Sequence, residues 1–107
     1  MNDSTNSSAA HKFGLAAKEY AEAKNTAAAC KIVCKRTWSE VYLTSSGSVK
    51  ERESRTDLNG RVQAKEDEYT TALSAENLAR GKLDYHDRLF EEYRTESSNR
   101  RAEMNLR

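Results

Sequence analysis

The chain has 107 residues, no proline and four glycines, and its 18 basic and 17 acidic side chains leave a formal net charge of +1. A chain of this length forms at most one domain, and its low net charge and scarcity of Pro and Gly argue against general disorder. A composition rich in Ala, Glu, Lys and Arg without proline is typical of long helices with a narrow apolar stripe, which excludes a β-sandwich or a Rossmann domain and disfavours a deep enzyme pocket.

The N-terminal residues and the apolar runs indicate where the chain resides. Residues 1–8 are rich in Ser, Asn and Asp, and they predict a disordered tail without the basic and apolar regions of a signal peptide. The longest uninterrupted apolar run, residues 27–30, is far too short to cross a membrane. We therefore expect a cytoplasmic protein that does not bind membranes.

A helical period begins near residue 9 and continues to about residue 44. Apolar and small side chains recur at steps of three and four residues and define a first seam, the stripe expected to pack against another helix. Small residues dominate its middle, where they would let a second helix approach closely. The residues of the first seam are Phe13, Ala16, Tyr20, Ala23, Ala27, Cys30, Cys34, Thr37 or Trp38, and Val41.

Two breaks follow this first helix. Small turn-forming residues cluster at 44–48 and predict a turn there. Ser48 and Glu51 match a capping box, in which each side chain bonds to the other residue's backbone amide. The box begins a short segment, residues 49–55, which the sequence leaves open as helix or loop. A second break falls at residues 56–60, where Asp57 is a candidate N-cap for the next helix.

A long second helix is expected over about residues 57–100. Charged residues at strict four-residue spacing, mostly alternating in sign, support an exposed face on it. Two long helices joined by a short linker predict an all-α antiparallel helical hairpin with a coiled-coil-like seam, a single domain over residues 9–107. Because one shared seam buries little, we expect a homo-oligomer. The residues of the second seam are Leu58, Val62, Tyr69, Ala72 or Leu73, Glu76, Ala79, Leu83, His86, Phe90 and Tyr93, with interruptions at Lys65 and Glu76.

The sequence lacks the motifs that mark catalytic sites. It has no G-x-S-x-G, no Gly-rich phosphate loop and no H-E-x-x-H, and its carboxylates lie at regular helical spacing. We therefore expect no enzymatic activity, no catalytic residue and no cofactor. Cys30, Cys34, His11 and His86 are zinc-ligand types, but C-x-x-x-C within one helix is not a zinc-knuckle spacing. The two cysteines are predicted to be small seam residues and not metal ligands, with a reactive thiol as the alternative.

Cations and aromatic side chains gather towards the end of the first predicted helix. Lysines on one stripe lie beside Trp38 and Tyr42, and single-strand binders combine cations that hold phosphates with rings on which bases stack. Alternatively, Trp38 packs on the partner helix and the lysine stems lie along the seam. Arg100 and Arg101 either support this patch or form a solvated helix end. The candidate residues for nucleic-acid or partner binding are Lys24, Lys31, Lys35, Arg36, Trp38, Tyr42, Arg100 and Arg101.

Four segments carry a resemblance to a known group of proteins. Residues 37–43 (TWSEVYL) end the first helix, residues 49–53 (VKERE) and 56–58 (TDL) follow the turn, and the last helix closes on residues 90–101 (FEEYRTESSNRR). Over residues 37–104 the chain resembles small helical-hairpin proteins of bacteriophage recombination and replication modules. The resemblance implies a recombination-mediator-like accessory role in the host cell cytoplasm, without catalytic residues. Such a protein would organise a recombinase, an annealing protein or a single-strand-binding protein on single-stranded DNA.

Two functions of different classes are compatible with these observations. The first is a phage-type accessory protein of DNA recombination or replication, an oligomer that binds single-stranded DNA or a DNA-bound recombinase or annealing protein. The second is a coiled-coil adaptor, or an inhibitor of a host or phage enzyme, with no DNA contact. It would use apolar side chains outside the seam, for which the candidates are Leu15, Ile32, Val33 and Leu43. A third class, secreted hairpins with W-x-G at the turn, is disfavoured because Glu40 stands where that motif has Gly.

Overall fold

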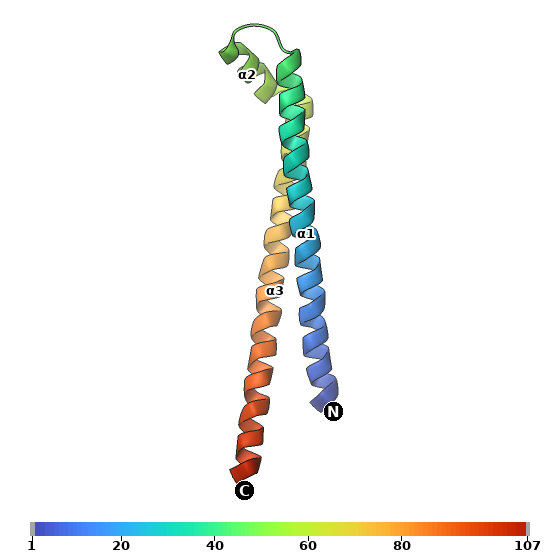
Figure 1. Ribbon diagram of the computed structural model, residues 1–107, viewed down its shortest axis with the longest axis vertical. Coiled ribbons are helices and arrows are strands. Elements are labelled where there is room, and N and C mark those ends of the chain that lie inside the picture. Colours follow the sequence, from blue (N-terminus) through green and yellow to red (C-terminus); the bar gives the residue numbers. More distant parts are fainter. Residues whose placement is uncertain (1, 107) are drawn as a thin grey trace. The chain divides into compact units, whose positions relative to one another are not determined.

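The computed structural model describes residues 2–106, with side chains described from Ser8 to Leu106, and these residues are helical except at 45–48 and 59. Within these residues there are three α-helices and no strand: α1 (Asn2–Thr44), α2 (Val49–Leu58) and α3 (Gly60–Leu106) (Figure 1). The predicted all-α class is thereby confirmed.

Helix α1 is longer at its N-terminal end than the sequence predicts. It begins at Asn2, so residues 2–8 are helical where a tail is expected, and Met1 lies outside the described residues. No proline or glycine stands before Gly14, so this stretch lacks the two residues that oppose a helical backbone most strongly. The C-terminal end of α1 at Thr44 agrees with the predicted limit.

The turn after α1 and the start of α2 have the expected chemistry. Gly47 has φ +110°, and a Cβ at this position would lie 2.6 Å from a side-chain oxygen of Glu51, so only glycine fits without strain. The Ser48 hydroxyl accepts from the Glu51 amide at 3.3 Å, which is the N-cap half of the predicted capping box. The open question over residues 49–55 is thereby answered, because α2 is a helix that continues to Leu58.

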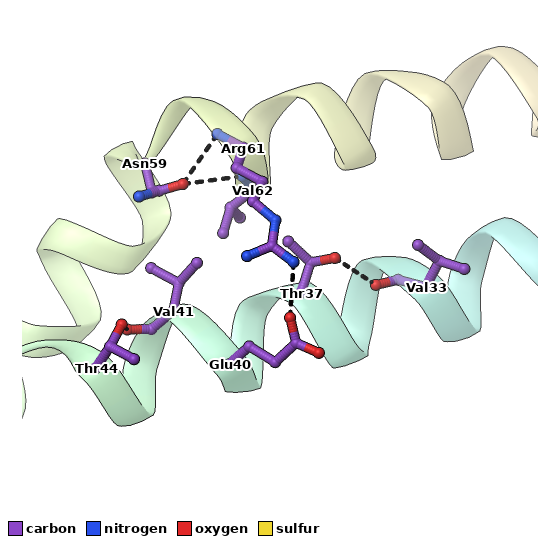
Figure 2. A network of polar contacts seen from close by, with 8 residues as sticks. All are labelled: Val33, Thr37, Glu40, Val41, Thr44, Asn59, Arg61 and Val62. Atoms are coloured by element: carbon purple, nitrogen blue, oxygen red, sulfur yellow. Dashed lines mark hydrogen bonds and ion pairs between the residues drawn. The ribbon is translucent and has the colours of Figure 1, made fainter.

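The junction between α2 and α3 corrects one predicted cap. Asp57 lies inside α2, and the cap of α3 is Asn59, whose side-chain oxygen accepts from the amides of Arg61 (2.9 Å) and Val62 (3.2 Å) (Figure 2). The backbone N–H of Asn59 also donates to the Thr56 carbonyl, so one residue ends α2 and begins α3. Helix α3 then extends beyond the predicted limit near residue 100 to Leu106.

The chain divides into two compact units. The turn unit is residues 22–76, and the termini unit combines the residues up to Ala21 with those from Asn77. In the termini unit the rings of Phe13 and Phe90 stack at 5.9 Å, and the Lys82 ammonium lies 3.0 Å from the Glu19 carboxylate. Phe13 precedes Glu19 whereas Phe90 follows Lys82, so the α1 and α3 segments of this unit run antiparallel.

The turn unit has a small core. Val62 and Thr56 are fully buried, and the Thr56 hydroxyl donates to the Arg52 carbonyl at 2.7 Å. Thr37 is also buried, and its hydroxyl donates to the Val33 carbonyl at 2.9 Å (Figure 2). Both buried hydroxyls are therefore satisfied by backbone acceptors one turn earlier in their own helices.

The two predicted seams agree closely with the observed burial. On α1 and α3 the buried and half-buried positions recur at alternating steps of three and four residues, including the predicted interruptions Lys65 and Glu76, which are half-buried. Of the alternatives Thr37 and Trp38, Thr37 is buried and Trp38 half-buried. Leu58 is wrongly assigned to the second seam, because it is 73% exposed. It is the last residue of α2, and the helical backbone is interrupted at Asn59, so the period of α3 does not continue back to Leu58.

Candidate binding surface

The four cations of the predicted patch on α1 are exposed. They lie in the turn unit, and within the described part of the chain no hydrogen bond or ion pair engages any of them. Their charge is therefore available to a ligand. These residues are Lys24, Lys31, Lys35 and Arg36.

The two aromatic residues of the patch are half-buried and face partners within the fold. The rings of Trp38 and Tyr42 stack with their centroids 5.1 Å apart and their planes 10° apart. The guanidinium of Arg52, from α2, lies over the Tyr42 ring at 4.1 Å from its centroid. The Trp38 indole N–H donates to the Asp57 carboxylate at 2.9 Å. We call Trp38, Tyr42, Arg52 and Asp57 the aromatic clamp.

The aromatic clamp fastens α2 to α1. Besides lying over the ring, Arg52 donates from Nη2 to the Tyr42 carbonyl at 2.9 Å. A stacked aromatic pair and a cation over a ring each contribute about 1 kcal/mol beyond simple burial. Arg52 Nε is buried without a hydrogen-bond partner in the described part of the chain, which offsets some of that gain. The rings of Trp38 and Tyr42 thus contact each other and residues of α2, whereas the alternative interpretation places Trp38 against the second long helix.

A second set of contacts joins α1 to the start of α3. The Arg61 guanidinium lies 2.7 Å from the Glu40 carboxylate, beside the Asn59 cap (Figure 2). At the end of α2, Arg55 donates to the Ser46 carbonyl at 2.7 Å and holds the turn. The sequence pattern does not identify Arg52, Arg55 and Arg61 as contact residues, because the Tyr42, Ser46 and Glu40 groups that they bind lie across the turn at separations with no helical period.

Arg100 and Arg101 are not part of this local arrangement. They are exposed residues of α3 in the termini unit, whereas the other six candidate residues belong to the turn unit. Neither arginine takes part in a hydrogen bond or ion pair within residues 2–106. Their local environment is that of a solvated helix end.

Apolar side chains are exposed on all three helices. The four residues predicted to lie outside the seam are exposed, with Ile32 at 54% and Leu43 at 75%. A further group on α2 and α3 was not predicted to be exposed, although the off-seam spacing of its α3 members was a usable signal. That group includes Val49, Leu58, Leu78, Tyr85 and Leu89.

The two cysteines lie along the first seam as free, half-buried thiols. Among the described residues no three or more His, Cys, Asp or Glu side chains gather as a set that could hold a metal ion. The helices of residues 2–106 include none with the length and hydropathy that a membrane span requires.

The fold and this surface define an all-α protein of long helices that presents exposed cations and exposed apolar side chains. Comparisons of the chain with protein-family models, with curated proteins and with solved structures find no match. The residues themselves therefore carry the functional inference.

Proposed function

We propose that this chain is a non-enzymatic protein-interaction module: an antiparallel helical hairpin with a coiled-coil-like seam that self-associates through exposed apolar helix faces. The observation that carries the proposal is a contrast on α1. Trp38 and Tyr42, the rings that a single-strand binder would offer to bases, are engaged in the aromatic clamp, whereas Ile32 and Leu43 are exposed. Exposed apolar side chains on a helix are a typical feature of protein-binding surfaces.

The small core supports self-association. The buried apolar residues in the described part of the chain are alanines and valines, and Val62 is the bulkiest of the fully buried apolar side chains. Such residues contribute little hydrophobic free energy, while every ordered residue costs about 1.5 kcal/mol of conformational entropy. Burying further apolar surface against a second copy would offset that cost.

The resemblance to phage recombination proteins suggests a cellular context for this module. In that context its partner beyond itself would be a recombinase, an annealing protein or a single-strand-binding protein, in the host cell cytoplasm. The exposed apolar residues Ile32 and Leu43 would bind such a protein without any base contact.

Direct binding of single-stranded DNA is the second candidate, favoured by the four cations of α1 that have no partner in the described residues. Because Trp38 and Tyr42 are engaged in the aromatic clamp, binding at these cations would depend on phosphate contacts alone. It would therefore be insensitive to base sequence and would weaken steeply with salt.

Sedimentation equilibrium, with and without a single-stranded oligonucleotide, tests the proposal. We expect the mass of the protein alone to rise with concentration, to be unchanged by the oligonucleotide at moderate salt, and to fall towards the monomer in the variant Ile32→Asp. Leu106→Asp is the matched control, because Leu106 is an exposed leucine near the end of α3. Circular dichroism verifies that both variants stay helical. A protein that is monomeric alone and changes mass only with the oligonucleotide would refute the proposal and favour DNA binding.

A further inference from the structure

The two cysteines of the chain form a pair on one face of α1. Cys30 and Cys34 are free thiols on the first seam, in the turn unit. They are four residues apart, and side chains at that spacing on a helix are neighbours whose Cβ atoms lie about 5 to 6 Å apart. A single helix thus holds two sulfur donors side by side.

The surroundings of this pair give partial protection from water. Both cysteines are half-buried, and the seam residues on either side of them, Ala27 and Thr37, are buried. Partial burial leaves the sulfur atoms within reach of a small ion. It also limits their contact with bulky thiol reagents.

The number and the softness of the donors select the kind of ligand. Among the described residues no further His, Cys, Asp or Glu side chain joins the two thiols to form a set of three or more. Zinc in structural sites takes four ligands, so two thiols alone leave a zinc site incomplete. Cu(I) is a soft ion that prefers thiolate ligands, and two thiolates on opposite sides of the ion satisfy it.

A two-coordinate ion also fits the geometry of the pair. A metal–thiolate bond is about 2.3 Å long, so an ion between two thiolates holds the sulfur atoms up to about 4.6 Å apart. Cβ atoms about 5 to 6 Å apart allow this separation when both side chains rotate, without any change in the helix. Two histidines four residues apart on a helix chelate zinc in the H-E-x-x-H motif by the same use of spacing.

We propose that Cys30 and Cys34 together bind one Cu(I) ion as a two-coordinate site on α1. Binding forms two copper–sulfur bonds and releases both thiol protons to the solvent, and neither copper nor sulfur changes its oxidation state. Because both ligands belong to one chain, the site does not depend on the self-association proposed above.

An exchange of two neighbouring residues provides a matched control. The double variant Ala29→Cys with Cys30→Ala keeps the composition and both thiols, but it places them five residues and about 140° apart around the helix. Position 29 is exposed, so the new thiol also lies outside the seam. Affinity is measured without oxygen, by competition with a chromogenic Cu(I) chelator.

We expect wild type to bind one Cu(I) ion per chain and the exchange variant to bind at least tenfold more weakly. Cys34→Ser, which leaves one thiol, should weaken binding at least as much. In concentrated urea no helix fixes the spacing of the thiols, so wild type and the exchange variant should there bind Cu(I) equally.

Two further measurements complete the test. Native mass spectrometry counts the ions bound per chain, and circular dichroism verifies that each variant is helical without urea. Equal affinity of the folded wild type and the folded exchange variant would overturn the proposal, because the spacing on the helix would then be irrelevant. One ion shared by two chains would overturn it as well, since the two thiolates would then come from different copies.

Discussion

The turn unit and the termini unit both contain segments of α1 and α3, but the contacts inside the two units differ. In the turn unit a third helix packs against α1 through the aromatic clamp, and Val62 and Thr56 are fully buried. In the termini unit the cross-helix contacts include a Phe13–Phe90 stack and an exposed Glu19–Lys82 ion pair. In this protein, the part of the helical pair with fully buried side chains is the part where a third helix, α2, packs against α1.

The largest expected loss of stability comes from removing side-chain volume from the core of the turn unit. Val62→Ala removes fully buried methyl groups and should lower the free energy of unfolding by about 2 kcal/mol. Leu83→Ala removes more atoms but from a half-buried position in the termini unit, and should cost about 1 kcal/mol or less. Urea denaturation measures both. If Leu83→Ala proved the more damaging, the turn unit would not be the more firmly packed region.

A pair of glycine substitutions gives effects of opposite sign. Gly47→Ala forces a side chain into the left-handed region and against Glu51, so it should destabilise by about 1 to 2 kcal/mol. Gly14→Ala, in α1 of the termini unit, meets open space and removes a flexible residue from a helix, so it should stabilise by about 0.5 to 1 kcal/mol. Thermal unfolding followed by circular dichroism compares the two. A neutral Gly47→Ala would contradict the φ observed there.

The smallest effects concern the polar contacts of each unit. Arg52→Ala removes the guanidinium that lies over the Tyr42 ring and its hydrogen bond to the Tyr42 carbonyl. It should lower the free energy of unfolding by about 1 kcal/mol. Lys82→Ala breaks an exposed ion pair and should cost about 0.5 kcal/mol or less, with the loss vanishing at high salt. Hydrogen exchange should show faster exchange in α2 for Arg52→Ala alone. Equal exchange in both variants would mean that the clamp does not hold α2.

The helices and their seams could be predicted because they follow local rules. A three- and four-residue period needs only one sequence, and it is sufficient to assign Ala27, Val62 and Phe90 to the seams. The period fails where a helix ends, which is why Leu58 was assigned to the wrong element. Asp57 and Asn59 are both good N-caps, and choosing between them depended on where α2 ends, because Asp57 lies inside that helix and Asn59 directly follows it.

The candidate site was predictable only in part. A helical wheel brings Trp38 and Tyr42 to the same side of α1, one turn apart, and the structure stacks them. The wheel cannot say that Arg52 lies over Tyr42, because that contact depends on how α2 folds back after the turn. Aromatic residues beside lysines thus suggested a base-stacking surface. In the structure the two rings instead contact Arg52 and Asp57 of α2, which no local pattern predicts.

The aromatic clamp also makes the intrinsic fluorescence of the protein informative. Trp38 is the only tryptophan in the chain, and its indole both stacks on Tyr42 and donates to Asp57. Its emission therefore reports a single event, the attachment of α2 to α1. A ligand that pulls α2 away would shift that emission to the red as water reaches the indole, whereas one that binds elsewhere would leave the spectrum as it is.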